Sequence, residues 1–160
     1  MTEQQQDRLD IMELMNHYAT GLDARDWVLW QSVFTEEAVF DLSSWNNVPS
    51  RSLVTEKVVR NQARVFAELT VTQHFLTNHR ITINDNSARC IAHMRAEHWL
   101  SNEDGSESRY TMFGYYDDKF VKTTNGWKMR EMQLNVTQTE GDIRVMDEAG
   151  RRAKAKRSQP

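Results

Sequence analysis

Asp23, His74 and His98 have residue types and positions in this 160-residue chain that point to proton-transfer chemistry. An imidazole has a pKa near neutrality, so a histidine can serve as a general acid or a general base. A carboxylate such as Asp23 can accept the Nδ1 proton of a histidine, which fixes the tautomer and raises the basicity of the other ring nitrogen. Tyr116 could hold a substrate oxygen. We therefore take Asp23, His74, His98 and Tyr116 as candidate catalytic residues.

Each candidate also has a purely structural alternative. Asp23 directly precedes a second helical segment and could cap its N-terminus. Either His74 or His98 could be a hydrogen-bonded histidine of the core. Tyr116 could be a wall residue that contacts no substrate. The sequence leaves these alternatives open.

The other three histidines indicate no metal site. His17 lies beside the apolar stripe of the first helical segment, and His79 and His93 have no acidic or histidine partner at a telling spacing. His93 and His98 point to opposite faces of a strand, and the chain has no HExxH or paired CxxC motif. We expect neither a metal nor a cofactor.

The N-terminal half of the chain is predicted to contain three helices that help to position these residues. Apolar residues recur at spacings of three and four over residues 8–22, 24–33 and 53–69, as in amphipathic helices. A short strand is expected over 36–42, followed by a polar loop over 43–52. His74 then lies between the third helix and the first long strand.

After Thr70 the apolar period changes to two. It predicts antiparallel strands over 77–83, 88–100, 109–122 and 126–139, separated by the turn sequences NDNS, NEDGS and TTNG. The fold class is therefore α+β, with three N-terminal helices packed on one strongly curved antiparallel sheet that encloses a pocket. We expect one domain over 1–140 and a charged, flexible C-terminal tail over 141–160.

Side-chain parity predicts which strand residues face the pocket. In the second long strand the inward residues are small or apolar and end in a histidine: Ala88, Cys90, Ala92, Met94, Ala96 and His98. The inward residues expected in the next two strands are Met112, Gly114, Tyr116, Asp118 and Phe120, then Arg130, Met132, Leu134 and Val136. Asp118 could pair with His98 or be a solvated charge near a turn. The outer face carries Ile91 and Trp99, which a second subunit could cover.

Candidate substrate-binding residues follow from the helix stripe and from this parity. They are Tyr18, Trp27, Phe40, Trp45, Phe66, Met94, Asp118 and Met132. Most are large and apolar, so the expected pocket is hydrophobic.

Composition excludes several classes of protein. Five Trp, six Phe and four Tyr supply enough buriable surface to exclude a disordered chain, and no apolar run is long enough to cross a membrane. All 23 Asp and Glu precede Gly150, which argues against a nucleic-acid partner, whereas five of the 20 Lys and Arg follow it. The single cysteine, Cys90, and a polar N-terminus without signal-peptide features favour the cytoplasm.

The chain resembles the SnoaL-like branch of the nuclear transport factor two-like superfamily in the order of four segments: GLDARDW, SVFTEEAVFDL, TQHFLTN and GYYDDKFVKTTNGWKM. The resemblance spans about residues 9–139 and implies a cone-shaped α+β fold that forms dimers or trimers through the sheet. Within it the chain is most similar to the scytalone dehydratase and hexachlorocyclohexane dehydrochlorinase families. Both place an aspartate at Asp23 and a histidine at His74 as a base-orienting pair, and the dehydratase has a second histidine near His98.

The chain departs from those families at the groups that hold the substrate. The two tyrosines of the dehydratase fall at Leu22 and near Leu42, and its serine and asparagine fall near Gly114 and Tyr116. The arginine of the dehydrochlorinase falls near Met132. The resemblance therefore implies the reaction class but a more apolar pocket.

The sequence predicts a cofactor-independent lyase or isomerase of the dehydratase type that acts on a small, apolar, cyclic molecule. His74 would abstract a proton, and His98 or Tyr116 would polarise a carbonyl or protonate the leaving oxygen. The alternatives are a polyketide cyclase and a non-catalytic module that binds a ligand or a subunit, like the β subunits of ring-hydroxylating dioxygenases.

Overall fold

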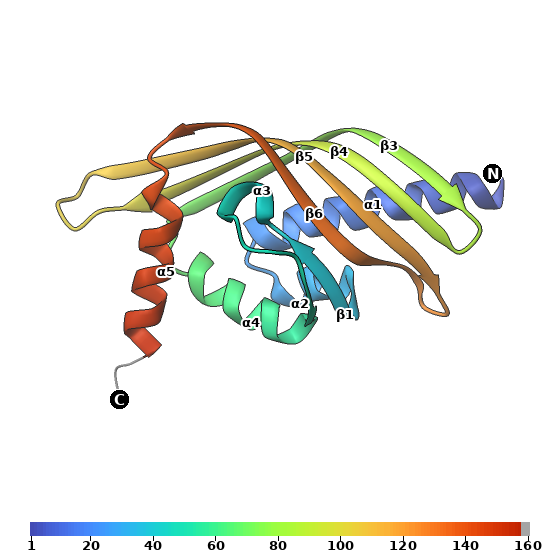
Figure 1. Ribbon diagram of the computed structural model, residues 1–160, viewed down its shortest axis with the longest axis horizontal. Helices are drawn as coiled ribbons and strands as arrows, with labels where there is room; N and C mark the ends of the chain where they lie inside the picture. Colours follow the sequence, from blue (N-terminus) through green and yellow to red (C-terminus); the bar gives the residue numbers. More distant parts are fainter. Residues whose placement is uncertain (158–160) are drawn as a thin grey trace.

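A strongly curved sheet forms one side of the molecule and helices close the other side, as the computed structural model shows for residues 1–157 (Figure 1). Within these residues the helices are α1 (Glu3–Asp23), α2 (Trp27–Ser32), α3 (Ser43–Asn46), α4 (Thr55–Phe66) and α5 (Arg144–Arg157). The strands are β1 (Phe34–Asp41), β2 (Arg51–Val54), β3 (Val71–Asn84), β4 (Ser87–Ser101), β5 (Glu107–Thr123) and β6 (Gly126–Gly141). The α+β class and the curved sheet are confirmed. None of these helices is long and apolar enough to cross a membrane.

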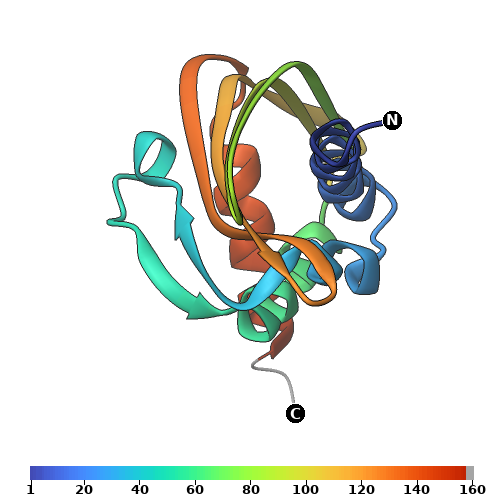
Figure 2. The ribbon, with the colours of Figure 1, turned by 90° about the vertical axis from the view of Figure 1, so that its right-hand side faces the viewer.

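The strands lie in the order β2-β1-β6-β5-β4-β3, and only the β1–β6 pair among them is parallel. The long strands β3 to β6 curl over α1, while β1, β2 and α3 extend to the other side (Figure 2). The inner surface of this curled sheet, together with α1, α2 and α4, encloses the hydrophobic core.

Helix α1 begins with a capping box and buries one stripe. The Thr2 hydroxyl accepts a hydrogen bond from the Gln5 backbone N–H at 3.2 Å, and the Thr2 N–H donates to the Gln5 side chain at 2.8 Å. Ile11, Met15 and Tyr18 are buried on the expected stripe. The cap explains why the helix begins five residues before the predicted start at residue 8.

The parity predicted for β4 is confirmed, and that for β5 is confirmed except at Gly114, which is half-buried. All six even residues of β4 from Ala88 to His98 are buried, and so are Met112, Tyr116, Asp118 and Phe120 of β5. Ile91 and Trp99, on the outer face of β4, are half-buried. Assembly of subunits through this outer face stays a prediction.

The parity predicted for β6 is wrong at Arg130, which is exposed. Lys119 pairs with Glu131 and Phe120 pairs with Met129, so Arg130 is an extra residue opposite no partner. Such a β-bulge reverses the parity of the strand. Trp127 and Met129 therefore point inward on one side of the bulge, while Met132 and Leu134 point inward on the other.

The structure has more helices than the three expected at the N-terminus. The expected helices form as α1, α2 and α4, and α3 and β2 occupy part of the segment expected to be a loop. Residues 144–157, expected within a flexible tail, form α5, which buries Val145, Met146 and Ala149. An ion pair of 2.7 Å between Lys156 and Glu68 also holds this helix. Residues 158–160 lie outside the described part of the chain.

Candidate active site

The carboxylate of Asp23 forms two hydrogen bonds with His74, one with its backbone and one with its ring. The His74 backbone N–H donates to Oδ2 at 2.7 Å, and His74 Nδ1 lies 2.6 Å from Oδ1. The His74 side chain is 4% exposed and that of Asp23 is 18% exposed. With Nδ1 protonated toward the carboxylate, Nε2 is the unprotonated ring nitrogen, as a general base requires. Nε2 has no hydrogen-bond partner within residues 1–157.

The end of α1 and the start of β3 bring this pair together. His74 lies within β3, which begins at Val71 and not at the predicted residue 77. Asp23 is the last residue of α1 and does not cap α2, because Asp26 takes that position and accepts a hydrogen bond from the Leu29 N–H at 2.9 Å. The N-cap alternative for Asp23 is therefore wrong, and its carboxylate is free to bind His74.

Thr72 and Arg25 hold the Asp23 carboxylate in place. The Thr72 hydroxyl donates to Asp23 Oδ1 at 3.0 Å, and the Arg25 guanidinium donates to the Thr72 hydroxyl at 2.7 Å. Burial opposes ionisation of Asp23, but the hydrogen bonds from His74 and Thr72 outweigh it and leave the carboxyl pKa below its usual value. Asp23 is thus an anion at neutral pH. Arg25 and Thr72 lie within the segments GLDARDW and TQHFLTN, but neither was singled out from the sequence as a site residue.

His98 lies next to His74 in a more deeply buried position. The two ring centroids are 5.5 Å apart with the rings nearly perpendicular, and Phe66 packs on both rings. Burial, and secondarily the electrostatic interaction with the neighbouring His74, lower the pKa of His98 from 6.5 to about 3. His98 is therefore neutral at pH 7, and its Nδ1 is buried without a hydrogen-bond partner.

Tyr18 and Tyr116 form a hydroxyl pair on the inner wall. The Tyr18 hydroxyl donates to the Tyr116 hydroxyl at 3.2 Å, and the rings pack edge to face at 5.2 Å. Burial raises the pKa of both phenols above the usual value, so both stay protonated at neutral pH. Each phenol keeps a proton, so the pair can donate one hydrogen bond to a substrate oxygen.

Asp118 is buried but does not pair with His98. The β4–β5 register places Asp118 opposite Cys90 and His98 opposite Tyr110, eight residues apart along β4. Asp118 Oδ1 accepts the backbone N–H of Gln133 at 3.0 Å, where the β5–β6 pairing is irregular. Burial raises the pKa of Asp118 well above its usual value, so the expectation of a solvated charge is also wrong.

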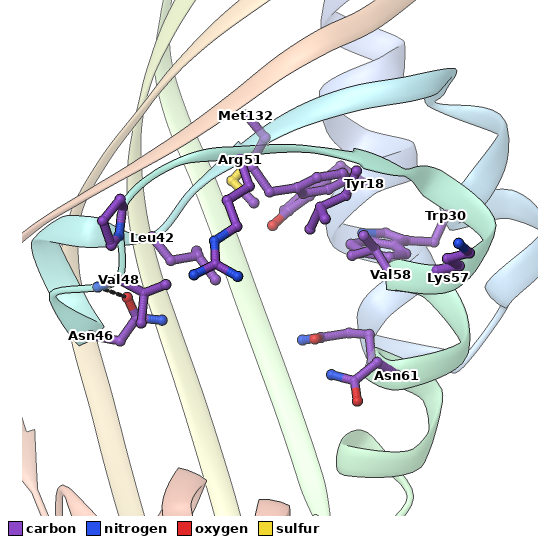
Figure 3. Close-up of a pocket in the computed structure, with 14 residues that line it drawn as sticks. Tyr18, Trp30, Leu42, Asn46, Val48, Arg51, Lys57, Val58, Asn61 and Met132 are labelled. Carbon is purple, nitrogen blue, oxygen red and sulfur yellow. Dashed lines mark hydrogen bonds between the residues drawn. The ribbon is translucent and has the colours of Figure 1, made fainter.

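A cavity of about 410 Å³ opens between β1, β2, α3 and α4 (Figure 3). Its volume is in the range that holds small organic ligands. Tyr18, Phe40 and Met132 are the predicted substrate-binding residues that line it. The other lining residues are Trp30, Leu42, Asn46, Val48, Pro49, Arg51, Leu53, Lys57, Val58, Asn61 and Gln62.

Several predicted site residues do not line this cavity. Asp23, His74, His98, Tyr116, Asp118, Met94 and Trp45 are absent from its wall. Trp27 and Phe66 form a row of aromatic contacts that begins at the wall residue Trp30. The ring centroids are 6.2 Å apart for Trp30 and Trp27, 6.0 Å for Trp27 and Phe66, and 6.4 Å for Phe66 and His74. This row of rings connects the wall residue Trp30 to His74, which itself does not line the cavity.

The polar residues at the cavity mouth were not predicted. Arg51 and Asn46 lie in the segment expected to be a loop, and Asn61 and Lys57 lie on an exposed side of α4. Gln62 lies within the helical segment expected over residues 53–69. No group of three or more histidine, cysteine, aspartate or glutamate side chains in residues 1–157 has the geometry of a metal site.

A family model of the SnoaL-like domain matches residues 3–133, so the chain belongs to the SnoaL-like family. Two solved structures share 28% of their residues with it. One is the Kfla4162 protein of Kribbella flavida, with a TM-score of 0.85 over 91% of this chain and 99% of that one. The other is a proposed aromatic ring hydroxylase of Novosphingobium aromaticivorans, with a TM-score of 0.76 over 88% and 96% of the two chains.

The two enzyme families named from the sequence have the same fold. A proposed scytalone dehydratase of Novosphingobium aromaticivorans is 20% identical, with a TM-score of 0.69 over 84% of this chain and 87% of that one. A type 2 hexachlorocyclohexane dehydrochlorinase is 14% identical, with a TM-score of 0.71 over 87% and 90% of the chains. At these identities the likeness concerns the fold, and the chemistry depends on the site itself.

Proposed function

We propose that this protein is a cofactor-independent lyase or isomerase of the dehydratase type, acting on a small, apolar, cyclic molecule. The observation that carries the proposal is the double hydrogen bond from the backbone and ring of His74 to one half-buried carboxylate. A lone core histidine needs no ionised partner, whereas a general base gains both orientation and basicity from one.

His74 Nε2 takes a proton from the carbon next to a carbonyl group. The C–H bond breaks, its electron pair forms an enolate, and the Asp23 carboxylate stabilises the imidazolium that results. In an elimination the enolate expels a β-hydroxyl, which leaves as water after it is protonated. In an isomerisation the proton returns at another carbon.

The Tyr18–Tyr116 pair is a better proton donor in this scheme than His98. Both phenols are protonated at neutral pH; the Tyr18 proton is bonded to the Tyr116 hydroxyl, so the free proton is that of Tyr116, which contacts the cavity-lining Tyr18. The lowered pKa of His98 means that it carries one ring proton and cannot act as an imidazolium acid at neutral pH. Its unpartnered Nδ1 is instead available to a polar group of the substrate.

The substrate must pass the row of rings formed by Trp30, Trp27 and Phe66 to reach His74. Tyr18 contacts Trp30 with a ring-centroid distance of 5.9 Å, so a ligand in the cavity lies directly against this row. The proposal therefore includes a rotation of Phe66 or Trp27 when the substrate binds.

The test is dehydration of a panel of cyclic β-hydroxy ketones, followed by the ultraviolet absorption of the enone product. We expect the wild type to accelerate the reaction of at least one compound and His74→Ala to lose about 10²- to 10⁴-fold of that rate. His93→Ala is the matched control, because His93 is exposed. Full activity of His74→Ala on a compound that the wild type turns over would disprove the role of His74.

A non-catalytic module that binds a ligand or a subunit is the second candidate function. It is favoured by the position of the Asp23–His74 pair behind the ring row, and by the 28% identity to a proposed aromatic ring hydroxylase. In that case the cavity would bind ligands, and no variant of His74 would affect any reaction. A polyketide cyclase would use the same base to form a carbon–carbon bond.

A further inference from the structure

The cavity has two chemically different ends. Its inner end is formed by buried apolar or aromatic side chains: Tyr18, Trp30, Phe40 and Met132 are all less than 9% exposed. Its exposed mouth carries the polar residues Arg51 on β2 and Lys57 and Asn61 on α4, beside the apolar Val48 and Leu53. A ligand that fits this cavity must have an apolar body and one polar end.

The polar end of the cavity is positively charged. Arg51 and Lys57 are the charged residues in its wall, which contains no Asp or Glu. Neither forms an ion pair with any residue in 1–157, whereas nearby Arg60 on the same helix is paired with Glu56 at 2.5 Å. Figure 3 shows the Arg51 guanidinium reaching from β2 into the space between α3 and α4, on the side of Leu42 and Val48.

Acidic residues outnumber basic ones in this protein, with 23 Asp and Glu against 20 Lys and Arg. Acidic partners are therefore abundant on the surface, yet none neutralises these two residues. A planar guanidinium binds a carboxylate with two parallel hydrogen bonds, and an amide N–H₂ such as that of Asn61 can donate a third.

We infer that the cavity binds an aromatic or alicyclic carboxylate, with the ring at Tyr18 and Trp30 and the carboxylate at Arg51. The inference depends on the proposed function only in treating this ligand as a substrate. Binding itself can be measured without turnover. In this orientation the carboxylate stays at the mouth, and the far side of the ring meets the row of aromatic side chains in front of His74.

Isothermal titration calorimetry with three naphthalene derivatives tests the inference. The probes are 2-naphthoate, 2-naphthylmethanol and 2-naphthylmethylamine, which share the ring and differ in charge; acetate is the probe without a ring. We expect 2-naphthoate to bind about tenfold or more tightly than the alcohol, because a charge-assisted hydrogen bond is worth more than a neutral one. The amine should bind most weakly, and acetate should not bind measurably.

Arg51→Gln should reduce the affinity for 2-naphthoate to that for the alcohol and leave the alcohol unchanged. Lys57→Gln is a second variant with a smaller loss expected, and Arg60→Gln, which removes a paired cation outside the cavity, should change nothing. All three side chains are exposed, so these substitutions leave the core intact. Equal affinity for naphthoate and alcohol, or an unchanged preference in Arg51→Gln, would overturn the inference.

The two proposals can fail separately. Carboxylate binding that depends on Arg51, without any reaction that depends on His74, would refute the proposed function and leave the ligand class standing. Turnover of neutral ketones that depends on His74, without a preference for carboxylates, would refute the ligand class alone.

Discussion

His98 should make the stability of this protein depend on pH in a way that one substitution removes. Its pKa is 6.5 in an unfolded chain and about 3 in the folded protein. Because the folded-state pKa is lowered, the unfolded chain binds the proton first, and stability is lost as the pH falls below 6.5. Each pH unit in this window costs about 1.4 kcal/mol, so acidification from pH 7 to pH 5 should cost roughly 2 kcal/mol through His98 alone.

Urea denaturation at a series of pH values, followed by tryptophan fluorescence, measures this dependence. Other groups also titrate between pH 7 and pH 5, so the informative quantity is the difference in slope between the wild type and His98→Gln. We expect His98→Gln to be less stable than the wild type at pH 7 and to lose roughly 2 kcal/mol less than the wild type on acidification. His93→Gln, at an exposed site, should keep the wild-type slope. An equal slope in wild type and His98→Gln would show that His98 is not held neutral by burial.

Two other substitutions test the packing around the site. Tyr18→Phe removes the hydrogen bond to Tyr116 and leaves a buried hydroxyl unpaired, so urea denaturation should show a loss of about 1–3 kcal/mol. Adding Tyr116→Phe should cost less than the sum of the single changes, and strict additivity would contradict the contact. Gly21→Ala places a methyl group 2.8 Å from the Trp30 Cβ and should cost about 1–3 kcal/mol. Gly150→Ala, a helical glycine with open space around it, should cost nothing; an equal loss in both variants would refute the close approach of α1 and α2.

Alternation of side chains predicted the site wherever the strands pair regularly. The β4–β5 pairing runs without a shift from Ser87 to Ser101, so parity placed His98 and Tyr116 correctly on the inner face. It failed at Arg130 because a bulge depends on the pairing of two strands and has no marker in either sequence alone. The prediction of a flexible tail was based on its positive charge and overlooked the apolar stripe of a helix, which includes Val145 and Ala149.

The pairing of Asp23 with His74 was predictable from the family resemblance, but the hydrogen bonds of Thr72 and Arg25 that hold Asp23 in place were not. Thr72 reaches both Asp23 and Arg25 only because the end of α1 meets the start of β3, a contact between residues 49 and 47 positions apart. The polar residues at the cavity mouth were not predicted for a similar reason. Arg51 was read as part of a loop, and only the short strand β2 places it opposite α4. Long-range packing of short elements leaves little local pattern in a sequence.

Exchange of α-protons in deuterium oxide tests the central claim that Asp23 and His74 form a general base. The wild type is incubated with a cyclic aryl ketone that has no leaving group, such as α-tetralone or its carboxylated analogue, and loss of the α-proton signal is followed by nuclear magnetic resonance. We expect wild-type exchange well above the buffer rate, exchange reduced to that rate in His74→Ala, and a partial loss in Asp23→Asn, which keeps the size of the side chain. Exchange at the wild-type rate in His74→Ala, or none above buffer in the wild type with a ligand that calorimetry shows to be bound, would contradict the claim.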